Sequence, residues 1–145
     1  MLKRKLSFIV FFIFCTFTGF AQNKDAIIGK WLSATSEGQI EIYKRSDKYF
    51  GKLSWIKEPN DEKGKPKLDS KNPNANLRTK PLLGLELLKD FIFEDGKWTD
   101  GTIYDPNTGK IYSCNLMLKD NGQLTIRGYI GISLIGRSES WKRVK

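Results

Sequence analysis

The 145-residue sequence contains no histidine. Histidine is the side chain that titrates near neutral pH, and it is the commonest metal ligand in proteins. Its absence excludes Ser–His and Cys–His nucleophiles and nearly all zinc and copper sites. The sequence also has no motif that supplies another activated nucleophile. We therefore expect no catalytic residue, no bound metal and no cofactor, and we do not expect an enzyme.

Cysteine is almost as scarce, with one residue at position 15 and one at position 114. Cys15 lies in a leading apolar segment, so Cys114 alone would remain after that segment is removed, and no intramolecular disulfide could form. Cys114 alternates with Tyr112 and Leu116 on one face of a predicted strand. We interpret it as a small buried hydrophobe.

The first 21 residues have the pattern of a secretory signal peptide. Residues 1–5 are basic, residues 6–20 form an uncharged apolar run, and Gly19-Phe20-Ala21 is a small-x-small cleavage site before Gln22. The run is short for a hydrocarbon core of about 30 Å. We therefore predict cleavage after Ala21, no transmembrane span in the mature chain, and export.

Short alternating segments joined by turn residues dominate the rest of the chain. The turn Asp120-Asn121-Gly122 separates two apolar runs, which is a strong hairpin signal. Similar signals predict strands over residues 30–34, 39–44, 49–56, 98–104, 110–119, 123–130 and 137–144. Leucines in residues 82–88 fit both helical and strand spacing, but Pro81 and Gly84 disfavour a long helix. There we predict a turn that leads into a strand ending near Phe93.

About eight or nine such strands with little helix predict an all-β, antiparallel barrel, formed by residues 22–145 as a single domain. Residues 58–80 interrupt the pattern with three prolines and four asparagines and predict a long loop. Its side-chain oxygens lack the spacing of a calcium loop, so we interpret them as Asx turns. They belong to Asp69, Asn72, Asn74 and Asn76.

The net charge suggests one class of partner. Removing Lys3, Arg4 and Lys5 lowers the formal charge from +9 to +6. An anionic envelope component could bind the lysine-rich loop, although scattered lysines on a solvated loop are the simpler interpretation. We expect no nucleic-acid partner, because no matching motif is present.

Several motifs in the mature chain are similar to one bacterial family, called Domain of Unknown Function 2147. They are Gly29-x-Trp31, Asn72-Pro73, Leu77-Arg78, Pro81-Leu82, Gly84-Leu85, Trp98-x-x-Gly101, Ile103-Tyr104-Asp105-Pro106-x-x-Gly109-x-x-Tyr112, Leu124-x-x-Arg127-Gly128-Tyr129-x-Gly131, Gly136-Arg137 and Trp141-x-Arg143. They follow the family's order along nearly the whole mature chain. The resemblance implies a small exported protein with a lipocalin-like barrel and without an established activity. Together with the Phe20-Ala21-Gln22 cleavage site, it implies export from a Gram-negative bacterium to the periplasm or beyond it.

A wider similarity is to lipocalins and fatty-acid-binding proteins, which open their first strand with Gly-x-Trp and pack a late arginine across the tryptophan. The resemblance implies a lipocalin/calycin-like barrel closed by Gly29, Trp31 and Trp141, with Arg143 or Arg137 as the late arginine. A cation over an indole contributes about 0.5–2 kcal/mol, depending on desolvation.

Two functions fit these expectations. In the first, a monomeric barrel binds a small hydrophobic or amphipathic ligand through strand-face residues, for which the candidates are Trp55, Trp98, Tyr104, Tyr112, Arg127 and Tyr129. In the second, the barrel is filled, and the chain is an envelope structural or interaction protein that acts through its surface and loop 58–80. An open interior would favour the first function, and a filled interior the second.

Overall fold

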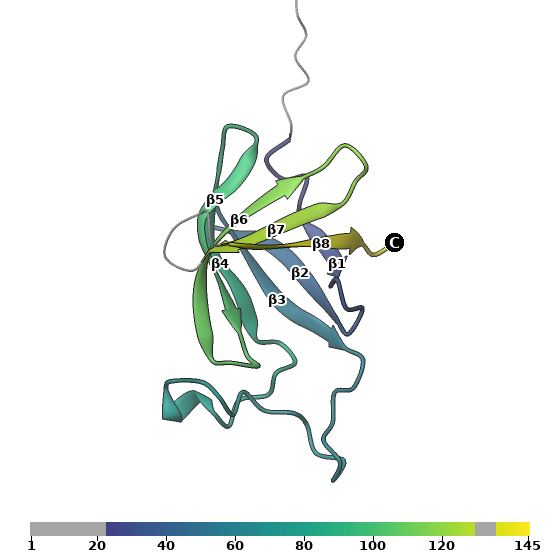
Figure 1. Ribbon diagram of the computed structural model, residues 1–145, viewed down its shortest axis with the longest axis vertical. Helices are drawn as coiled ribbons and strands as arrows, with labels where there is room; N and C mark the ends of the chain where they lie inside the picture. Colours follow the sequence, from purple (N-terminus) through teal and green to yellow (C-terminus); the bar gives the residue numbers. More distant parts are fainter. Residues whose placement is uncertain (1–22, 130–135) are drawn as a thin grey trace, which may run out of the picture.

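A computed structural model describes residues 23–129 and 136–145. In these residues eight antiparallel strands form one closed barrel, in which each strand pairs with the next and the last pairs with the first (Figure 1). The prediction of an all-β antiparallel barrel is confirmed. The strands are β1 (Gly29–Leu32), β2 (Gly38–Arg45), β3 (Lys48–Ile56), β4 (Glu86–Glu94), β5 (Lys97–Asp105), β6 (Lys110–Leu118), β7 (Leu124–Tyr129) and β8 (Arg137–Arg143).

Some predictions concern residues outside this description. The predicted signal peptide, Cys15 within it, the cleavage site before Gln22, the end of the predicted strand at residue 130, and Gly131 all lie there. In the described residues, no helix has the length and apolar character needed to cross a membrane.

Tight turns account for two of the hairpins. Ser46 and Asp47 join β2 to β3 with φ values of 50° and 62°, and Asp95 and Gly96 join β4 to β5 with φ values of 51° and 75°. Positive φ at both central residues is the type I′ geometry, whose twist matches that of the flanking strands. Aspartate, serine and glycine tolerate this region better than branched residues.

Strand ends differ from the predictions by one or two residues. The first strand ends at Leu32, not at residue 34, because Ser33 begins a turn in which its hydroxyl accepts a 3.2 Å hydrogen bond from the Gly38 amide. Residues 82–85 form the predicted turn, and β4 follows as the predicted strand.

Large side chains fill one half of the barrel. Trp31, Tyr49, Phe91 and Trp98 are at most 1% exposed and belong to one continuous apolar cluster. Phe91 packs so closely on Gly101 that a Cβ at that glycine would lie 2.5 Å from the ring. The small residue is therefore required by the packing.

The segment just before β1 closes this filled end; we call residues 23–28 the N-terminal plug. Its Ile27 is fully buried, and the indole nitrogens of Trp31 and Trp98 donate 2.9 Å hydrogen bonds to the carbonyls of Ile27 and Lys24. Buried indole N–H groups need acceptors, so these bonds attach the plug to the barrel core.

Residues 58–80, which we call the flap, extend from the opposite end of the barrel (Figure 1). The flap contains one short 3₁₀ turn, η1 (Ala75–Leu77), and isolated bridges join Asn60 to Pro66 and Leu68 to Pro81. It is an ordered loop held by its own hydrogen bonds and by contacts with the barrel.

Candidate functional site

Arg143 packs on the tryptophan of the Gly-x-Trp motif. Its guanidinium lies 4.2 Å from the centre of the Trp31 ring and donates hydrogen bonds to the carbonyls of Ile28 and Ala26 in the plug. A Cβ at Gly29 would lie 3.0 Å from Nη1 of Arg143. These contacts join the two ends of the described barrel, and the arginine that makes them is Arg143.

Arg137 lies elsewhere. Its guanidinium pairs with Glu139 at 3.3 Å and is largely exposed. Trp141 is buried, and its indole nitrogen lies 3.4 Å from a carboxylate oxygen of Glu139. Arg143, and not Arg137, is therefore the late arginine that packs on Trp31.

Three of the six predicted ligand-binding residues do not line an open interior. Trp98 is fully buried against Tyr49 and Phe93. Trp55 is 41% exposed and pairs with Gln39 on the outer face, and Tyr104 is buried beneath the flap.

Two β-bulges explain the positions of Trp55 and Tyr104. Strict alternation from Leu53 would place Trp55 inside, but the register shift between Gln39 and Ile40 leaves Ser54 as an extra residue and turns Trp55 outward. A second register shift, between Trp98 and Gly101, turns the Tyr104 side chain to the outer face in the same way. One inserted residue moves every later side chain to the opposite face.

The Tyr104 phenol holds the flap on the barrel. It donates a 2.6 Å hydrogen bond to Oδ1 of Asp69, which is fully buried, while Asn72 donates a 2.7 Å bond to Oδ2. Burial, and then the hydrogen bond to Asp69, raises the pKa of Tyr104 to about 12. The side-chain oxygens of Asn72 and Asn74 accept backbone N–H groups within the flap, as Asx turns do.

A small hollow of about 310 Å³ lies beside the plug, lined by Lys24, Lys44, Asp47, Tyr49, Ile92 and Phe93. The Tyr49 phenol donates a 2.6 Å hydrogen bond to Asp25 there, and this bond is the main cause that lowers the pKa of Asp25. Burial raises the pKa of Tyr49 above its usual value. Asp25, Lys44, Asp47 and Tyr49 already pair with one another, so we assign this hollow to the plug contacts.

The end of the barrel opposite the plug differs in character. β8 has no register shift against β7, so Glu139 and Arg137 face the same side as the buried Trp141, which is the inner side. The side chains of Glu139 and Arg137 are nevertheless 35% and 85% exposed. Both charged side chains therefore reach solvent at this end of the barrel, as expected because a buried charge is costly.

Apolar side chains lie beside these charges. Ile126 and Gly128 on β7 are the direct partners of Glu139 and Arg137. A Cβ at Gly128 would meet Ile103 and Tyr112 only at 3.8 Å, an ordinary contact distance. We call this region, formed by Ile103, Tyr112, Gly128, Arg137 and Glu139, the barrel mouth.

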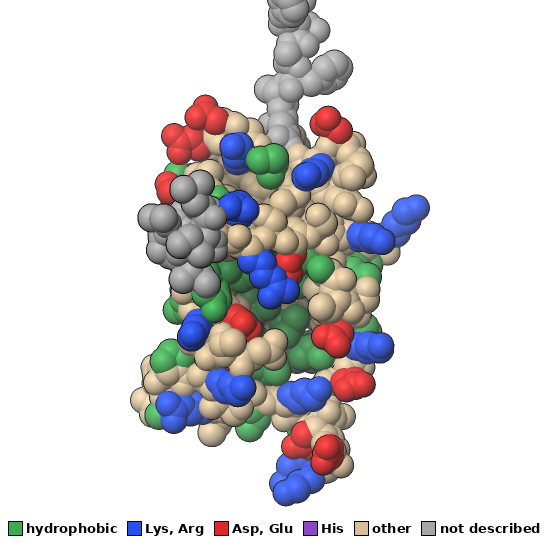
Figure 2. Space-filling view, in the orientation of Figure 1, with side chains coloured by type: hydrophobic (Ala, Val, Ile, Leu, Met, Phe, Trp, Pro, Cys, Tyr) green, Lys and Arg blue, Asp and Glu red, His purple; other side chains and the backbone are tan. Residues whose placement is uncertain are grey.

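A space-filling view shows one face of the molecule. Figure 2 shows a hollow at the centre of one face, with hydrophobic side chains in its depth and charged side chains of both signs around it. The mouth therefore combines an apolar wall with a cation and an anion, which suits a ligand with one apolar and one charged part.

The remaining two sequence candidates lie on the outside. Arg127 and Tyr129 pair with Ser138 and Ser113 on the outer face, and the Arg127 guanidinium lies 5.3 Å from the centre of the Tyr129 ring. Of the six candidates, Tyr112 alone belongs to the mouth.

Sequence reasoning did not single out Glu139. Its alternation with Trp141 was the available signal, because both lie on one face of the same strand. Cys114 is buried on the inner face with Leu116, and burial raises the pKa of its thiol to about 12. It is a core residue without thiolate character.

Comparison with known proteins places this geometry in context. The family described as "Uncharacterized protein conserved in bacteria (DUF2147)" matches residues 29–143. A similar solved structure is described as "Protein HP1028 from the human pathogen Helicobacter pylori belongs to the lipocalin family", with a TM-score of 0.71 and 22% identity, covering 81% of this chain and 82% of that chain. At this identity the likeness shows the fold alone, a lipocalin-like barrel. No curated protein matches the chain.

Proposed function

The chain belongs to the bacterial family DUF2147, and we propose that this lipocalin-like barrel is an exported protein that binds a small amphipathic ligand at the barrel mouth. Residues 1–21 act as the signal peptide, and the mature chain works as a monomer in the periplasm or outside the cell. Intact-mass spectrometry of the exported protein should give the mass of residues 22–145, with or without cyclisation of Gln22. Retention of the leader would contradict export.

The exposed Arg137–Glu139 pair on the inner face of β8 is the observation that carries the proposal. An anionic head group would bind Arg137 in place of Glu139, and the apolar part would lie against Ile103 and Tyr112. A charged hydrogen bond in a partly desolvated site contributes about 1.5–3 kcal/mol, whereas the apolar contacts contribute in proportion to the area that they bury.

Binding of a fluorescent fatty acid tests this proposal. We expect saturable fluorescence enhancement with the native protein and about tenfold weaker binding for Arg137→Ala, which corresponds to 1.4 kcal/mol. Glu139→Gln should bind the anionic probe more tightly, because it frees Arg137 from its partner. Lys142→Ala, an exposed change on the outer side of the same strand, is the matched control.

A second variant tests the location of the ligand. Gly128→Leu would place a side chain among Ile103, Tyr112 and Arg137 and should abolish binding of the probe. Unchanged binding in both Gly128→Leu and Arg137→Ala would contradict a site at the mouth. No saturable binding of anionic, neutral or cationic alkyl probes would overturn the proposal.

The flap favours an alternative, an envelope interaction protein. Trp55, Leu68, Leu77 and Leu83 are 41–51% exposed in or beside the flap, among lysines. Exposed apolar residues next to cations suit an anionic surface. Sedimentation with vesicles that contain anionic lipid should then occur and should be lost in a Leu68→Ser, Leu77→Ser double variant. Equal sedimentation with neutral vesicles would contradict this alternative.

A further inference from the structure

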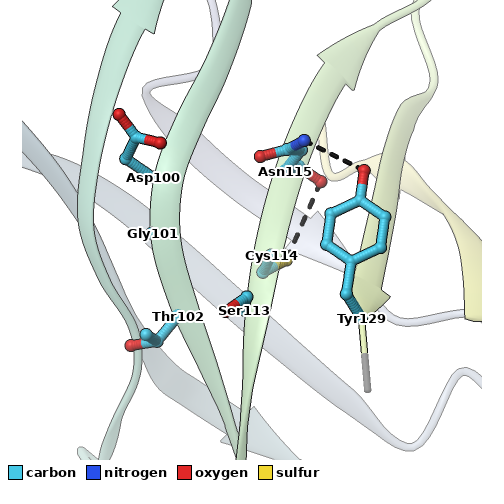
Figure 3. A pocket seen from close by; sticks show the side chains of 7 residues that line it. All are labelled: Asp100, Gly101, Thr102, Ser113, Cys114, Asn115 and Tyr129. Carbon is cyan, nitrogen blue, oxygen red and sulfur yellow. Dashed lines mark hydrogen bonds between the residues drawn. The ribbon is translucent and has the colours of Figure 1, made fainter. Parts of the chain in front are cut away.

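A second hollow lies on the outer surface of the barrel, away from the mouth. It spans β5, β6 and β7, has a volume of about 390 Å³ and is lined by Asp100, Gly101, Thr102, Ser113, Cys114, Asn115 and Tyr129 (Figure 3). Small-molecule sites have volumes of about 300–1,000 Å³, so the hollow is large enough for a compact ligand.

The β-bulge in β5 forms one wall of this hollow. β5 has one residue more than β6 between the pairs Trp98–Leu116 and Gly101–Cys114, and Asp100 adopts a φ of 60° there. A bulge redirects side chains relative to the regular pleat. The carboxylate of Asp100 is thereby brought to the edge of the hollow.

Three polar side chains of the hollow have no partner among the described residues. In residues 23–129 and 136–145, the structure gives no hydrogen bond or ion pair to the Asp100 carboxylate or to the hydroxyls of Thr102 and Ser113. Thr102 and Ser113 are direct cross-strand partners, so their side chains lie side by side. Together they offer a row of one carboxylate and two hydroxyl groups to a ligand.

The opposite wall is an aromatic ring held in place. Asn115 donates a 2.9 Å hydrogen bond to the Tyr129 hydroxyl (Figure 3), and Arg127 lies against the ring while donating a 3.0 Å bond to Ser138. A ring fixed at its tip and on its π system presents apolar surface at low entropic cost. In the part of the chain that the structure describes, no hydrogen bond to the Asn115 side-chain oxygen is found, so this oxygen can accept one from a ligand.

We propose that this outer hollow, formed by Asp100, Thr102, Ser113, Asn115 and Tyr129, is a binding site for a neutral saccharide unit. A pyranose ring combines hydroxyl groups with apolar C–H faces, and the site combines hydrogen-bonding groups with an aromatic ring. The carboxylate of Asp100 accepts hydrogen bonds from sugar hydroxyls and repels anionic sugars. This site is independent of the ligand proposed for the mouth.

Heteronuclear NMR titration of isotope-labelled protein, expressed from the full 145-residue chain, tests the proposal. Galactose, N-acetylglucosamine and galacturonate are the probes, and glycerol controls for general effects of polyols. We expect localised, saturable shifts at residues 100–102, 113–115 and 129 with millimolar dissociation constants for at least one neutral sugar, and at least threefold weaker binding of galacturonate.

Matched variants assign the binding to these side chains. Tyr129→Leu should weaken binding at least tenfold. Asn115→Ala should have the same effect, and it serves as the test variant if the replacement of the tyrosine disturbs folding. Asp100→Asn keeps the shape and tolerates positive φ, and it should remove the discrimination against galacturonate. Met117→Ala, on the same outer strand face but outside the hollow, should bind like the native protein.

The negative outcomes are equally defined. The absence of saturable shifts with both neutral sugars overturns the proposal, as does unchanged binding in both Tyr129→Leu and Asn115→Ala. Arg137→Ala separates the two sites, because it should weaken the fatty-acid probe at the mouth and leave the sugar titration unchanged.

Discussion

The Tyr104 hydroxyl donates a 2.6 Å hydrogen bond to the carboxylate of Asp69, a residue with no exposed surface, and so joins the flap to the barrel. The backbone supports this contact, because the Asp69 amide donates a hydrogen bond to the Lys80 carbonyl and the Asp69 carbonyl accepts one from the Asn72 amide. At Gly109, a Cβ would lie only 2.0 Å from the Lys71 carbonyl oxygen. The flap is therefore packed on the β5–β6 hairpin.

Tyr104→Phe should destabilise the fold by about 1–3 kcal/mol, because a buried carboxylate loses one of its donors. Urea unfolding measures the change, and hydrogen exchange should increase first in residues 58–80. Tyr112→Phe is the matched control, since no hydrogen bond to its hydroxyl is found in the described residues, and it should change stability by less than about 0.5 kcal/mol. Equal effects of the two changes would contradict the anchoring role.

Arg143→Ala should lower the free energy of unfolding by about 2–3 kcal/mol, because it removes a cation–π contact with Trp31 and hydrogen bonds to the plug. Thermal unfolding followed by tryptophan fluorescence measures this loss. The neighbouring exposed change Lys142→Ala provides the comparison. A loss below about 0.5 kcal/mol for Arg143→Ala would mean that the plug is held without the arginine.

Gly101→Ala and Gly128→Ala form a matched pair on the inner face of the barrel. At Gly101 the new methyl group would lie 2.5 Å from the Phe91 ring, whereas at Gly128 the nearest atoms are 3.8 Å away. Overpacking costs about 1–3 kcal/mol, so we expect that loss at Gly101 and little change at Gly128. Denaturant unfolding of both variants measures the difference, and a larger cost at Gly128 would contradict the described packing.

Alkaline pH should destabilise the protein. The pKa values of Tyr43 and Tyr104 are raised from 10.0 to about 12. Burial is the largest cause, and the second is the hydrogen bond that each phenol donates, from Tyr43 to Glu86 and from Tyr104 to Asp69. Below pH 10 both folded and unfolded chains keep these protons, and the contribution to stability is complete. Between pH 10 and about 12 the unfolded chain releases them first, so stability falls as pH rises.

Spectrophotometric titration of phenolate absorbance, combined with urea unfolding at each pH, measures this effect. Tyr104→Phe should remove one of the late-titrating groups and reduce the slope of stability against pH. Stability that stays constant between pH 10 and 12 would show that the two phenols titrate normally.

Much of the fold could be predicted from local patterns. Period-two alternation placed Cys114 and Leu116 on the inner face of their strand, where the structure has them. The predicted turns at residues 94–97 and 105–109 join the expected strands. Such features depend on neighbouring residues, so the sequence contains the information that decides them.

The candidate site could be predicted less well, because it depends on registers between strands that are distant in sequence. Each bulge inserts one extra residue, and no feature of the local composition identifies it. Ser54 is the extra residue in β3, and Thr99 or Asp100 is the extra residue in β5. These insertions move Trp55 and Tyr104 from the expected face to the opposite one. Tyr112 follows a regular stretch of β6 and keeps its expected face.

The sequence by itself determined the all-β class, the order of the strands and the turns that join them, because turn chemistry and alternation act over a few residues. Only the tertiary structure decided that the flap is anchored through Asp69, that Arg143 and not Arg137 packs on Trp31, and that Arg137 and Glu139 share the mouth. The physical reason is that these contacts join segments distant along the chain, and closure of the barrel and its bulges set which side chains meet.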